Sequence, residues 1–246
     1  AAQARKFSAP TKSLASEPVP EKLGGEFWEV PRCNAGLKLL GDLAPSGTDW
    51  RYVMQDESRR SFVGFLPKAL GNEACSYLFE KIKSETIWQQ PRGANGPIPR
   101  KTCWMVAHGC TCTYRYGGIT VAPQVYPTWM KELMHEILPK CGLGQVDDWP
   151  SCCNLNLYED GASSVGWHAD DEALFQGKFH DCRIISFSLG TARKFEVRLN
   201  WPQLGEKSLV NLLLGDGDMC TMEGMTQKHA QHRVPREPGI VGSRIN

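Results

Sequence analysis

The amino-acid sequence predicts an α+β fold in which a double-stranded β-helix, or jelly roll, is flanked by helices. Three observations support this prediction. Segments before residue 140 place apolar residues at helical spacing, and after residue 150 the apolar period changes to two, which is typical of strands. Glycines punctuate the strand-like runs. Helices followed by many short strands favour an α+β chain with a double-sheet core.

Length, composition and charge are those of a globular protein. The chain has 246 residues, of which 41% are hydrophobic and 22% are charged, so it can bury a sizeable core. No apolar run reaches the roughly 18 residues of a membrane helix, so we expect no membrane contact. Lys and Arg number 28 against 27 for Asp and Glu. This balance neither indicates nor excludes nucleic acid, and a basic surface would have to be local.

Residues 1–51 are rich in Pro, Gly, Ser and Lys and show no periodicity. We expect an extended, partly disordered N-terminal arm there, anchored by Phe27, Trp28 and Val30, and one domain over residues 52–246. The N-terminus has no apolar signal segment, which predicts an intracellular protein of the nucleus or cytoplasm. The first 16 residues carry basic side chains and no acid, which leaves an organelle open.

The elements of the first half follow from local patterns. Residues 61–66 predict a strand that ends at Pro67. A helix is predicted within residues 71–90, and a second one at 127–138, where Pro127 suits the first turn. The apolar residues expected on the buried faces are Ala74, Leu78, Ile82 and Ile87 in the first helix, and Trp129, Leu133 and Ile137 in the second.

The second half is predicted to form strands. From Cys153 to Tyr158, apolar residues alternate with polar ones, so one face should be buried. Further strand-like runs, separated by glycines, occupy residues 183–189, 193–199, 208–214 and 217–222.

Ten cysteines raise the question of disulfides or zinc. Cys110-x-Cys112 and Cys152-Cys153 match no zinc-finger spacing, and the sequence contains no Cys-x-x-Cys. We interpret the cysteines as reduced, mostly buried thiols of an intracellular protein.

Residues 167–172 contain the first pattern that indicates a functional site, a candidate metal site. In an extended chain, residues two apart point to the same face, so His168 and Asp170 can present an imidazole and a carboxylate together. A ligand from a distant strand would complete a facial triad of two histidines and one carboxylate, which suits Fe(II) chemistry with oxygen. The tripeptide His168-Ala169-Asp170 alone is weak evidence for a metal site. A surface histidine near acidic residues is commoner than a histidine that binds a metal.

Further segments strengthen this prediction because they occur in a defined order. They are Pro99-Arg100-Lys101, Tyr114-Arg115-Tyr116, Asn156-Leu157-Tyr158, His168-Ala169-Asp170-Asp171-Glu172, Ser186-Phe187-Ser188-Leu189-Gly190, Arg193-Lys194-Phe195, Gly217-Asp218-Met219, His232-Arg233-Val234-Pro235 and Arg244-Ile245-Asn246. With these segments, the sequence from about Pro99 to Asn246 resembles the AlkB family of Fe(II)- and 2-oxoglutarate-dependent dioxygenases.

The resemblance implies that His168, Asp170 and His232 bind Fe(II), with 2-oxoglutarate and O2 as co-substrates. His232 is preferred to His229 because the His-Arg-Val-Pro match falls there, and residues three apart face opposite ways on a strand. We expect the side chain of His229 to be solvated.

The resemblance also implies contacts to 2-oxoglutarate. Asn156 and Tyr158 match positions that hydrogen-bond this molecule; the alternative is a buried polar pair. Arg244 matches an arginine that pairs with the distal carboxylate, and Asn246 belongs to the same motif. The sequence ends before the threonine and second arginine of that motif. We therefore expect a chain cut within its last strand; the alternative is that another basic residue substitutes for the missing arginine.

On the substrate side, an alkylated base must leave the stack before its methyl group can be reached. The resemblance implies that Tyr114 and Tyr116 line the pocket, with Tyr116 stacking on the base opposite His168; cross-strand packing is the alternative. The further candidates are Trp167, Asp171, Glu172 and Arg193. A charged turn is the alternative for the two acids, and an ion pair at a strand edge is the alternative for Arg193.

A basic segment lies beside this predicted pocket. Between residues 81 and 115 the single acid, Glu85, is outnumbered by Lys81, Lys83, Arg92, Arg100, Lys101 and Arg115. We expect nucleic-acid backbone contacts from Arg100 and Lys101, and a nucleotide-recognition lid at residues 88–101. A solvated helix face is the alternative.

Together these features predict an enzyme for the oxidative demethylation of N-alkylated bases, such as 1-methyladenine and 3-methylcytosine, in DNA. The reaction would be coupled to the decarboxylation of 2-oxoglutarate to succinate and would release formaldehyde. We expect a monomer whose partner is alkylated DNA. The alternatives are an RNA demethylase, a dioxygenase that acts on protein, and a non-catalytic nucleic-acid-binding module.

Overall fold

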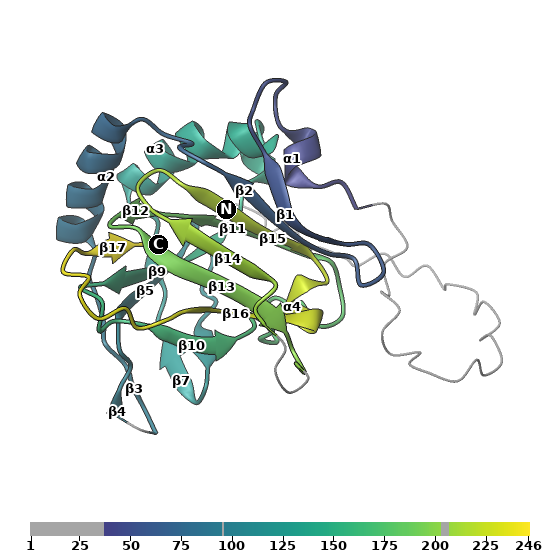
Figure 1. Cartoon of the computed structure of the whole chain (residues 1–246). Coiled ribbons are helices and arrows are strands. Elements are labelled where there is room, and N and C mark those ends of the chain that lie inside the picture. Colours follow the sequence, from purple (N-terminus) through teal and green to yellow (C-terminus); the bar gives the residue numbers. More distant parts are fainter. Residues whose placement is uncertain (1–36, 95, 203–206) are drawn as a thin grey trace, which may run out of the picture. The chain divides into compact units, whose positions relative to one another are not determined.

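The structure is a computed structural model that describes residues 37–94, 96–202 and 207–246. Figure 1 labels its helices and strands. The longer helices are α2 (Asn72–Glu85) and α3 (Thr128–Ile137), and the short helical segments are α1 (Leu40–Leu43), α4 (Thr226–His229) and the 3₁₀ turns Leu138–Cys141 and Val146–Asp148. None of the described helices is long and apolar enough to span a bilayer.

Helix α2 is shorter than predicted. Its buried residues are Cys75, Leu78 and Ile82, which follow helical spacing. Ile87 was expected on this face, but it lies beyond the end of the helix and is exposed. Ala74 is also exposed.

Helix α3 agrees closely with its prediction. It begins directly after Pro127, which is its N-cap. The predicted face is buried, with Trp129, Leu133 and Ile137 in the core.

One four-stranded antiparallel sheet has the strand order β1-β2-β15-β11. Its strands are β1 (Arg51–Asp56), β2 (Ser61–Leu66), β15 (Met219–Gly224) and β11 (Cys182–Phe187). The two central strands are almost entirely buried, which explains why β2 is a continuous apolar run rather than an alternating one.

A second four-stranded antiparallel sheet has the order β10-β16-β13-β14. Its strands are β10 (Val165–His168), β16 (Ala230–Val234), β13 (Arg193–Leu199) and β14 (Val210–Leu214). Burial alternates along β16 and much of β13, as expected for strands with one face toward a core. This sheet carries both histidines of the predicted metal site.

A third sheet has the order β12-β17-β9-β5-β8. Its strands are β12 (Leu189–Gly190), β17 (Arg244–Ile245), β9 (Cys152–Tyr158), β5 (Lys101–Val106) and β8 (Gln124–Val125). Two hairpins pair β3 (Arg92–Gly93) with β4 (Gly96–Pro97), and β6 (Tyr114–Tyr116) with β7 (Ile119–Val121). The first hairpin occupies the predicted lid.

Apolar side chains pack these elements together. The largest cluster joins α1, α2 and α3 to β5 and β9, and α2 also contacts β12 (Figure 1). A second cluster brings Val63 and Met222 of the first sheet against Phe195 and Val197 of the second. Helices and many strands agree with the predicted α+β class, while the jelly-roll arrangement itself stays a prediction.

The N-terminal arm is not extended throughout residues 1–51. Helix α1 places Leu40 in the core with no exposed surface. The backbone N–H of Leu40 also donates to the buried carboxylate of Glu223 at 2.8 Å. This segment therefore packs as part of the domain. The predicted anchors Phe27, Trp28 and Val30 lie outside the described residues.

Candidate active site

The predicted metal donors come together at the end of β10. The antiparallel register of β10 and β16 places His168 directly opposite His232. One donor atom from each of His168, Asp170 and His232 lies within 4.8 Å of the others. The Asp170 carboxylate is 3.8 Å from His168 Nε2 and 3.4 Å from His232 Nε2. Within the described residues, no other trio of His, Cys, Asp or Glu side chains converges in this way.

Contacts behind the donors fix their orientation. Nδ1 of His168 lies 2.8 Å from the Gly166 carbonyl, so it carries the proton and leaves Nε2 to face Asp170. The N–H of Asp170 donates to Gln227 Oε1 at 2.9 Å. Burial raises the pKa of Asp170 and lowers the pKa of His232 well below its usual value, which keeps that imidazole neutral. Two imidazoles and one carboxylate are a donor set that fits Fe(II).

His229 lies outside this group, and the expectation of a solvated side chain is wrong. It ends helix α4, and only 8% of its surface is exposed. The reason is that α4 packs against β2 and β15, so the turn before β16 is part of the interior.

Arg244 is a buried cation with unused donors. Its side chain has no exposed surface, and burial lowers the pKa of its guanidinium. Nη2 donates to Ser188 Oγ at 2.9 Å, but Nε and Nη1 have no hydrogen-bond partner. The guanidinium carbon lies 5.4 Å from the centre of the Tyr158 ring, which is buried opposite it on β9. Two N–H groups of this guanidinium are therefore available to an anionic group or an ordered water.

Asn156 and Asn246 hold the strand that carries Arg244. Their main chains exchange two hydrogen bonds, of 2.8 and 3.0 Å. The side chain of Asn246 donates to Ser186 Oγ and to the Phe187 carbonyl, so it ties β17 to β11. Oδ1 of Asn156 accepts from Arg100 Nε at 2.7 Å. Both side chains thus have protein partners beside the predicted 2-oxoglutarate site.

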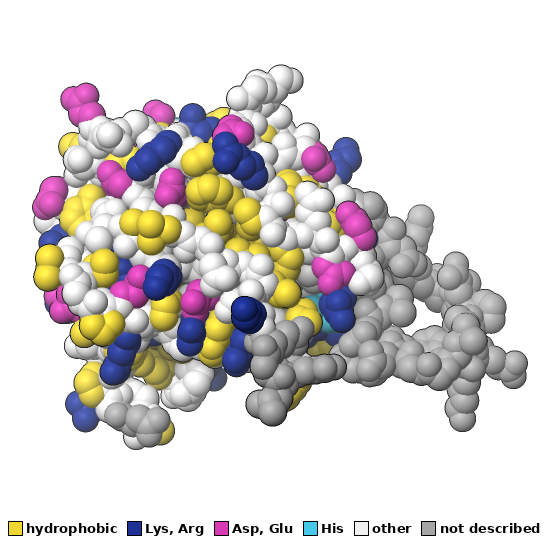
Figure 2. Space-filling view, in the orientation of Figure 1, with side chains coloured by type: hydrophobic (Ala, Val, Ile, Leu, Met, Phe, Trp, Pro, Cys, Tyr) yellow, Lys and Arg dark blue, Asp and Glu magenta, His cyan; other side chains and the backbone are white. Residues whose placement is uncertain are grey.

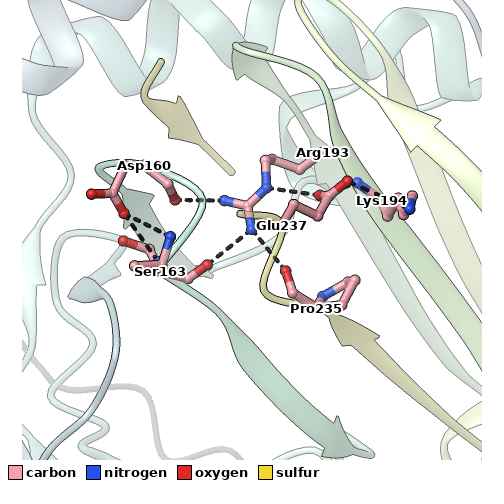
Figure 3. Close-up of polar contacts among 7 residues, drawn as sticks. Asp160, Ser163, Arg193, Lys194, Pro235 and Glu237 are labelled. Atoms are coloured by element: carbon pink, nitrogen blue, oxygen red, sulfur yellow. Dashed lines mark hydrogen bonds and ion pairs between the residues drawn. The ribbon is translucent and has the colours of Figure 1, made fainter. Parts of the chain in front are cut away.

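Arg193 occupies a different environment from the predicted substrate pocket. Figure 3 shows its buried guanidinium between the turn before β10 and the segment after β16. Nε donates to Glu237 at 2.9 Å, and Nη1 donates to the Asp160 carbonyl at 2.8 Å. Nη2 donates to the carbonyls of Ser163 and Pro235 at 2.9 and 2.7 Å. These contacts favour the alternative interpretation, a structural ion pair.

Four aromatic side chains form what we call the aromatic wall: Trp104, Tyr114, Tyr116 and Phe175. Tyr114 stacks on Trp104 with ring centroids 4.8 Å apart, and it contacts Tyr116 at 5.0 Å and Phe175 at 5.9 Å. Tyr114 is almost fully buried, whereas Tyr116 is partly accessible. Tyr116 is thus the member of the predicted pair that a ligand can reach.

The two acids after the metal motif differ in their contacts. Asp171 pairs with Lys178 at 2.6 Å, as in a charged turn. Oε1 of Glu172 accepts from the Tyr114 hydroxyl at 2.9 Å, and burial raises the pKa of this carboxyl. Its other oxygen, Oε2, is buried and has no partner, and the same is true of the Tyr116 hydroxyl. Buried polar atoms of this kind call for a ligand or an ordered water.

Trp167 was predicted to bind substrate, and the structure places it elsewhere. Its ring lies between two guanidinium groups, 4.3 Å from Arg198 and 4.5 Å from Arg233. Arg233 follows His232 on β16, and Arg198 follows the His232 partner Val197 on β13, so both arginines lie on the face opposite the His232 side chain. Trp167 therefore lies on the face of the sheet opposite the metal donors.

The basic residues at the start of β5 point in two directions. Arg100 lies 6.0 Å from the centre of the Tyr116 ring, whereas Lys101 pairs with Glu159 at 2.8 Å. Figure 2 shows Lys and Arg side chains gathered toward the lower part of one face, where Figure 1 places β10 and the β3–β4 hairpin. Sequence patterns give no signal for Phe175 or Gln227, which join the site from an irregular segment and a short helix.

A sequence-family model supports the class of protein that this donor set and fold define. The model described as the 2OG-Fe(II) oxygenase superfamily matches residues 61–246. This range covers most of the chain and contains all three donors. The chain therefore belongs to the 2OG-Fe(II) oxygenase superfamily, whose cofactor is Fe(II) and whose co-substrates are 2-oxoglutarate and O2.

Curated relatives confirm the resemblance to AlkB proteins. The human protein named alpha-ketoglutarate-dependent dioxygenase alkB homolog 3 is 32% identical over 199 residues, which are 76% of this chain and 64% of that protein. The rat protein of the same name is 30% identical, over 76% of this chain and 62% of that protein. The human DNA oxidative demethylase ALKBH2 is 25% identical over 96% of this chain and 90% of that protein.

The chain spans a little less than two thirds of the alkB homolog 3 proteins that it matches. The solved structure titled "The structure of OsALKBH1" has a TM-score of 0.51 and 16% identity, over 74% of this chain and 93% of that one. At this identity, the structural similarity supports the fold alone.

Proposed function

We propose that the chain is an oxidative demethylase of N-alkylated bases in DNA, with 1-methyladenine and 3-methylcytosine as substrates. The observation that carries this proposal is a pair of buried polar sites whose hydrogen bonds are incomplete. Arg244 offers two buried donors without a partner on the predicted co-substrate side. Glu172 and Tyr116 offer buried polar atoms without a partner in the aromatic wall region, and the charge of Asp170 acts on Glu172.

The proposed fold is the jelly roll. Two four-stranded antiparallel sheets contribute apolar side chains to one shared cluster, which is the packing of a double-sheet roll. The metal donors lie on one of these sheets and the loop that follows β10. A rigid sheet holds such donors more precisely than a loop alone would.

His168, Asp170 and His232 would hold Fe(II) and leave three coordination positions open. When bound, Fe(II) supplies the activation of O2 that oxidises the N-methyl group to formaldehyde while 2-oxoglutarate is decarboxylated to succinate. Gly166 and Gln227 orient two of these donors through the hydrogen bonds described above. Positioning of this kind typically has large effects on metal affinity.

Arg244 would bind the distal carboxylate of 2-oxoglutarate. Its remaining donors are charged, buried and without a partner, so a carboxylate there gains strong charge-assisted hydrogen bonds. Ser188 fixes the guanidinium through Nη2. Asn156 and Tyr158 flank this site on β9, and Asn246 anchors β17 beside it.

Glu172 and Tyr116 would recognise the flipped base. The free oxygen of Glu172 can accept from an exocyclic amine, and methylation at the proposed ring nitrogens makes the base cationic, which favours a nearby carboxylate. Tyr114 holds Glu172 in place. Arg100 and Lys101 start β5 next to the β3–β4 hairpin and would contact the phosphate backbone. The partner we propose is therefore alkylated DNA.

The test measures formaldehyde and succinate release from methylated DNA oligonucleotides with Fe(II) and 2-oxoglutarate. We expect equal amounts of the two products with the wild-type chain. His232→Ala should abolish turnover, because it removes a metal donor. The matched control is His108→Ala, which changes an exposed histidine outside the donor group and should retain turnover.

Methylated RNA and methylated peptides serve as competing substrates. Turnover on either of them, with none on DNA, would overturn the proposed substrate while keeping the reaction. No turnover on any substrate with an iron-loaded chain would support the non-catalytic binding module instead.

A further inference from the structure

Cys110 and Cys112 form an accessible pair of thiols in the loop between β5 and β6. The N–H of Cys110 donates to the Ala107 carbonyl at 3.0 Å, and Gly109 adopts a positive φ of 89°, so the chain turns sharply before the pair. Both cysteines are free; Cys112 is exposed and Cys110 partly so. Neither has a role in the proposed demethylase reaction.

The two side chains are in direct contact. The backbone N–H and the thiol of Cys112 both donate to the sulfur of Cys110. These donors stabilise a thiolate at Cys110 and lower its pKa, while the same contact raises the pKa of Cys112. An accessible thiol of lowered pKa with a second thiol beside it is the arrangement found in redox-sensitive cysteine pairs.

The neighbouring cysteines have the opposite character. Cys152 and Cys153 on β9 are each paired with β5 and partly buried. Burial raises the pKa of Cys152 to about 11 and that of Cys153 to about 12. These two thiols stay protonated and unreactive at neutral pH, although they are adjacent in sequence.

The loop is coupled to the aromatic wall through one hydrogen bond. The indole N–H of Trp104 donates to the backbone carbonyl of Cys112 at 2.7 Å. Trp104 in turn stacks on Tyr114, whose hydroxyl holds Glu172. A change in the backbone at Cys112 is therefore transmitted to the residues of the proposed base pocket.

We propose that Cys110 and Cys112 are a peroxide-sensitive dithiol that closes reversibly to a disulfide and thereby shifts the aromatic wall. The disulfide itself does not depend on the proposed demethylase function, whereas its effect on base binding rests on that function. A disulfide between residues two apart in an exposed loop belongs to the labile, regulatory class.

The chemistry is a two-electron oxidation in two steps. The Cys110 thiolate attacks hydrogen peroxide; an S–O bond forms, the O–O bond breaks, and hydroxide leaves, which gives the sulfenic acid. The Cys112 sulfur then attacks the Cys110 sulfur; the S–S bond forms, the S–O bond breaks, and the hydroxyl leaves with the Cys112 proton as water. A thiol reductant such as glutathione reverses the reaction by exchange.

The test oxidises the full chain with hydrogen peroxide and maps its cysteines by mass spectrometry. The protein is loaded with Mn(II), which suits the same donors and does not consume peroxide as ferrous iron does. We expect the loss of two hydrogens per chain, a Cys110–Cys112 disulfide in the peptide map, and full reversal by reductant. Cys112→Ser should stop at a sulfenic acid on Cys110, which dimedone traps, and Cys110→Ser should give neither product.

Cys152→Ser and Cys153→Ser are the matched controls and should oxidise as the wild type does. Peroxide that leaves both loop thiols free, or that links either of them to Cys152, would overturn the proposal. Coupling to the pocket is measured separately, as the affinity for a methylated oligonucleotide. The oxidised chain should bind roughly 3–10-fold more weakly, on the scale of one lost hydrogen bond. An unchanged affinity in a chain that binds the oligonucleotide when reduced would refute the coupling.

Discussion

Arg193 and Arg244 are both buried without exposed surface, and both lie near the same Tyr158 ring, at 5.7 and 5.4 Å from its centre. Every nitrogen of the Arg193 guanidinium donates to the protein, to one carboxylate and three carbonyls. Arg244 has one protein acceptor and two nitrogens with none. Of these two arginines, both buried within the described part of the chain, the protein saturates the hydrogen bonds of Arg193 and leaves those of Arg244 incomplete.

This difference in hydrogen-bond partners is the one expected between a cation that stabilises the fold and a cation that binds a ligand. A buried charge without compensating partners is costly, and the cost is avoided only if a ligand supplies the missing acceptors. Residue type, burial and strand position are the same for both arginines, so none of these distinguishes them. The number of protein acceptors does distinguish them, and it is the reason why we propose Arg244 as the ligand-binding arginine.

The largest expected effect is on stability at Arg193. Arg193→Met removes one partner of a buried ion pair and three carbonyl contacts, so the free energy of unfolding should fall by about 3–5 kcal/mol. Urea titration followed by circular dichroism measures this change. Arg193→Lys keeps the positive charge that pairs with Glu237. Its free energy of unfolding should therefore lie between those of the wild type and Arg193→Met. Lys194→Met changes the exposed neighbour and is expected to shift stability by less than about 0.5 kcal/mol. A stable Arg193→Met protein that has lost substrate affinity would reverse our assignment.

Arg244 should show the complementary behaviour. Arg244→Met removes the charged donors for the 2-oxoglutarate carboxylate, so binding should weaken by about 2–5 kcal/mol, or at least 30-fold. Stability should stay constant or rise, because an uncompensated buried charge is replaced by an apolar side chain. Isothermal titration with 2-oxoglutarate and urea titration measure the two effects, with exposed Arg236→Met as control. If Arg244→Met lowered the free energy of unfolding as much as Arg193→Met does, the proposed difference between the two arginines would be wrong.

The smallest effect is expected at Glu237. Glu237→Gln keeps an oxygen for Arg193 but removes the charge, so the free energy of unfolding should decrease by about 1 kcal/mol, and 2-oxoglutarate affinity should not change. The exposed Glu136→Gln serves as the control in the same urea titrations. If this variant weakened 2-oxoglutarate binding, the two arginines would have to be treated as one coupled site.

Strand alternation was sufficient to predict part of the site. The spacing of two residues indicated that His168 and Asp170 present their side chains together, although Asp170 lies in the loop after β10, and the AlkB resemblance selected His232, which the register brings opposite His168. The rule does not apply in the same way to Trp167, because the register of β10 shifts between Val165 and His168; its place follows from its contacts with Arg198 and Arg233. Helix α3 and strand β13 were likewise recognisable from their periodicity.

Other features depend on partners that are distant in sequence. The acceptors of Arg193 are mainly backbone carbonyls of a turn and of a C-terminal segment, and backbone groups leave no pattern in a sequence. His229 lies on a single helical turn, too short for periodicity to show. Strand β5 is buried along most of its length, so it lacks the alternation that identifies half-exposed strands.

The pairing of β10 with β16 has a consequence for how the protein is made. His168 and His232 meet across strands that are far apart in the chain, and β13 and β14 are synthesised between them. Such non-local contacts form late, since long loops must close first. A growing chain therefore cannot assemble all three donors until β16 has left the ribosome, and the edge of β10 that pairs with β16 stays unpaired until then.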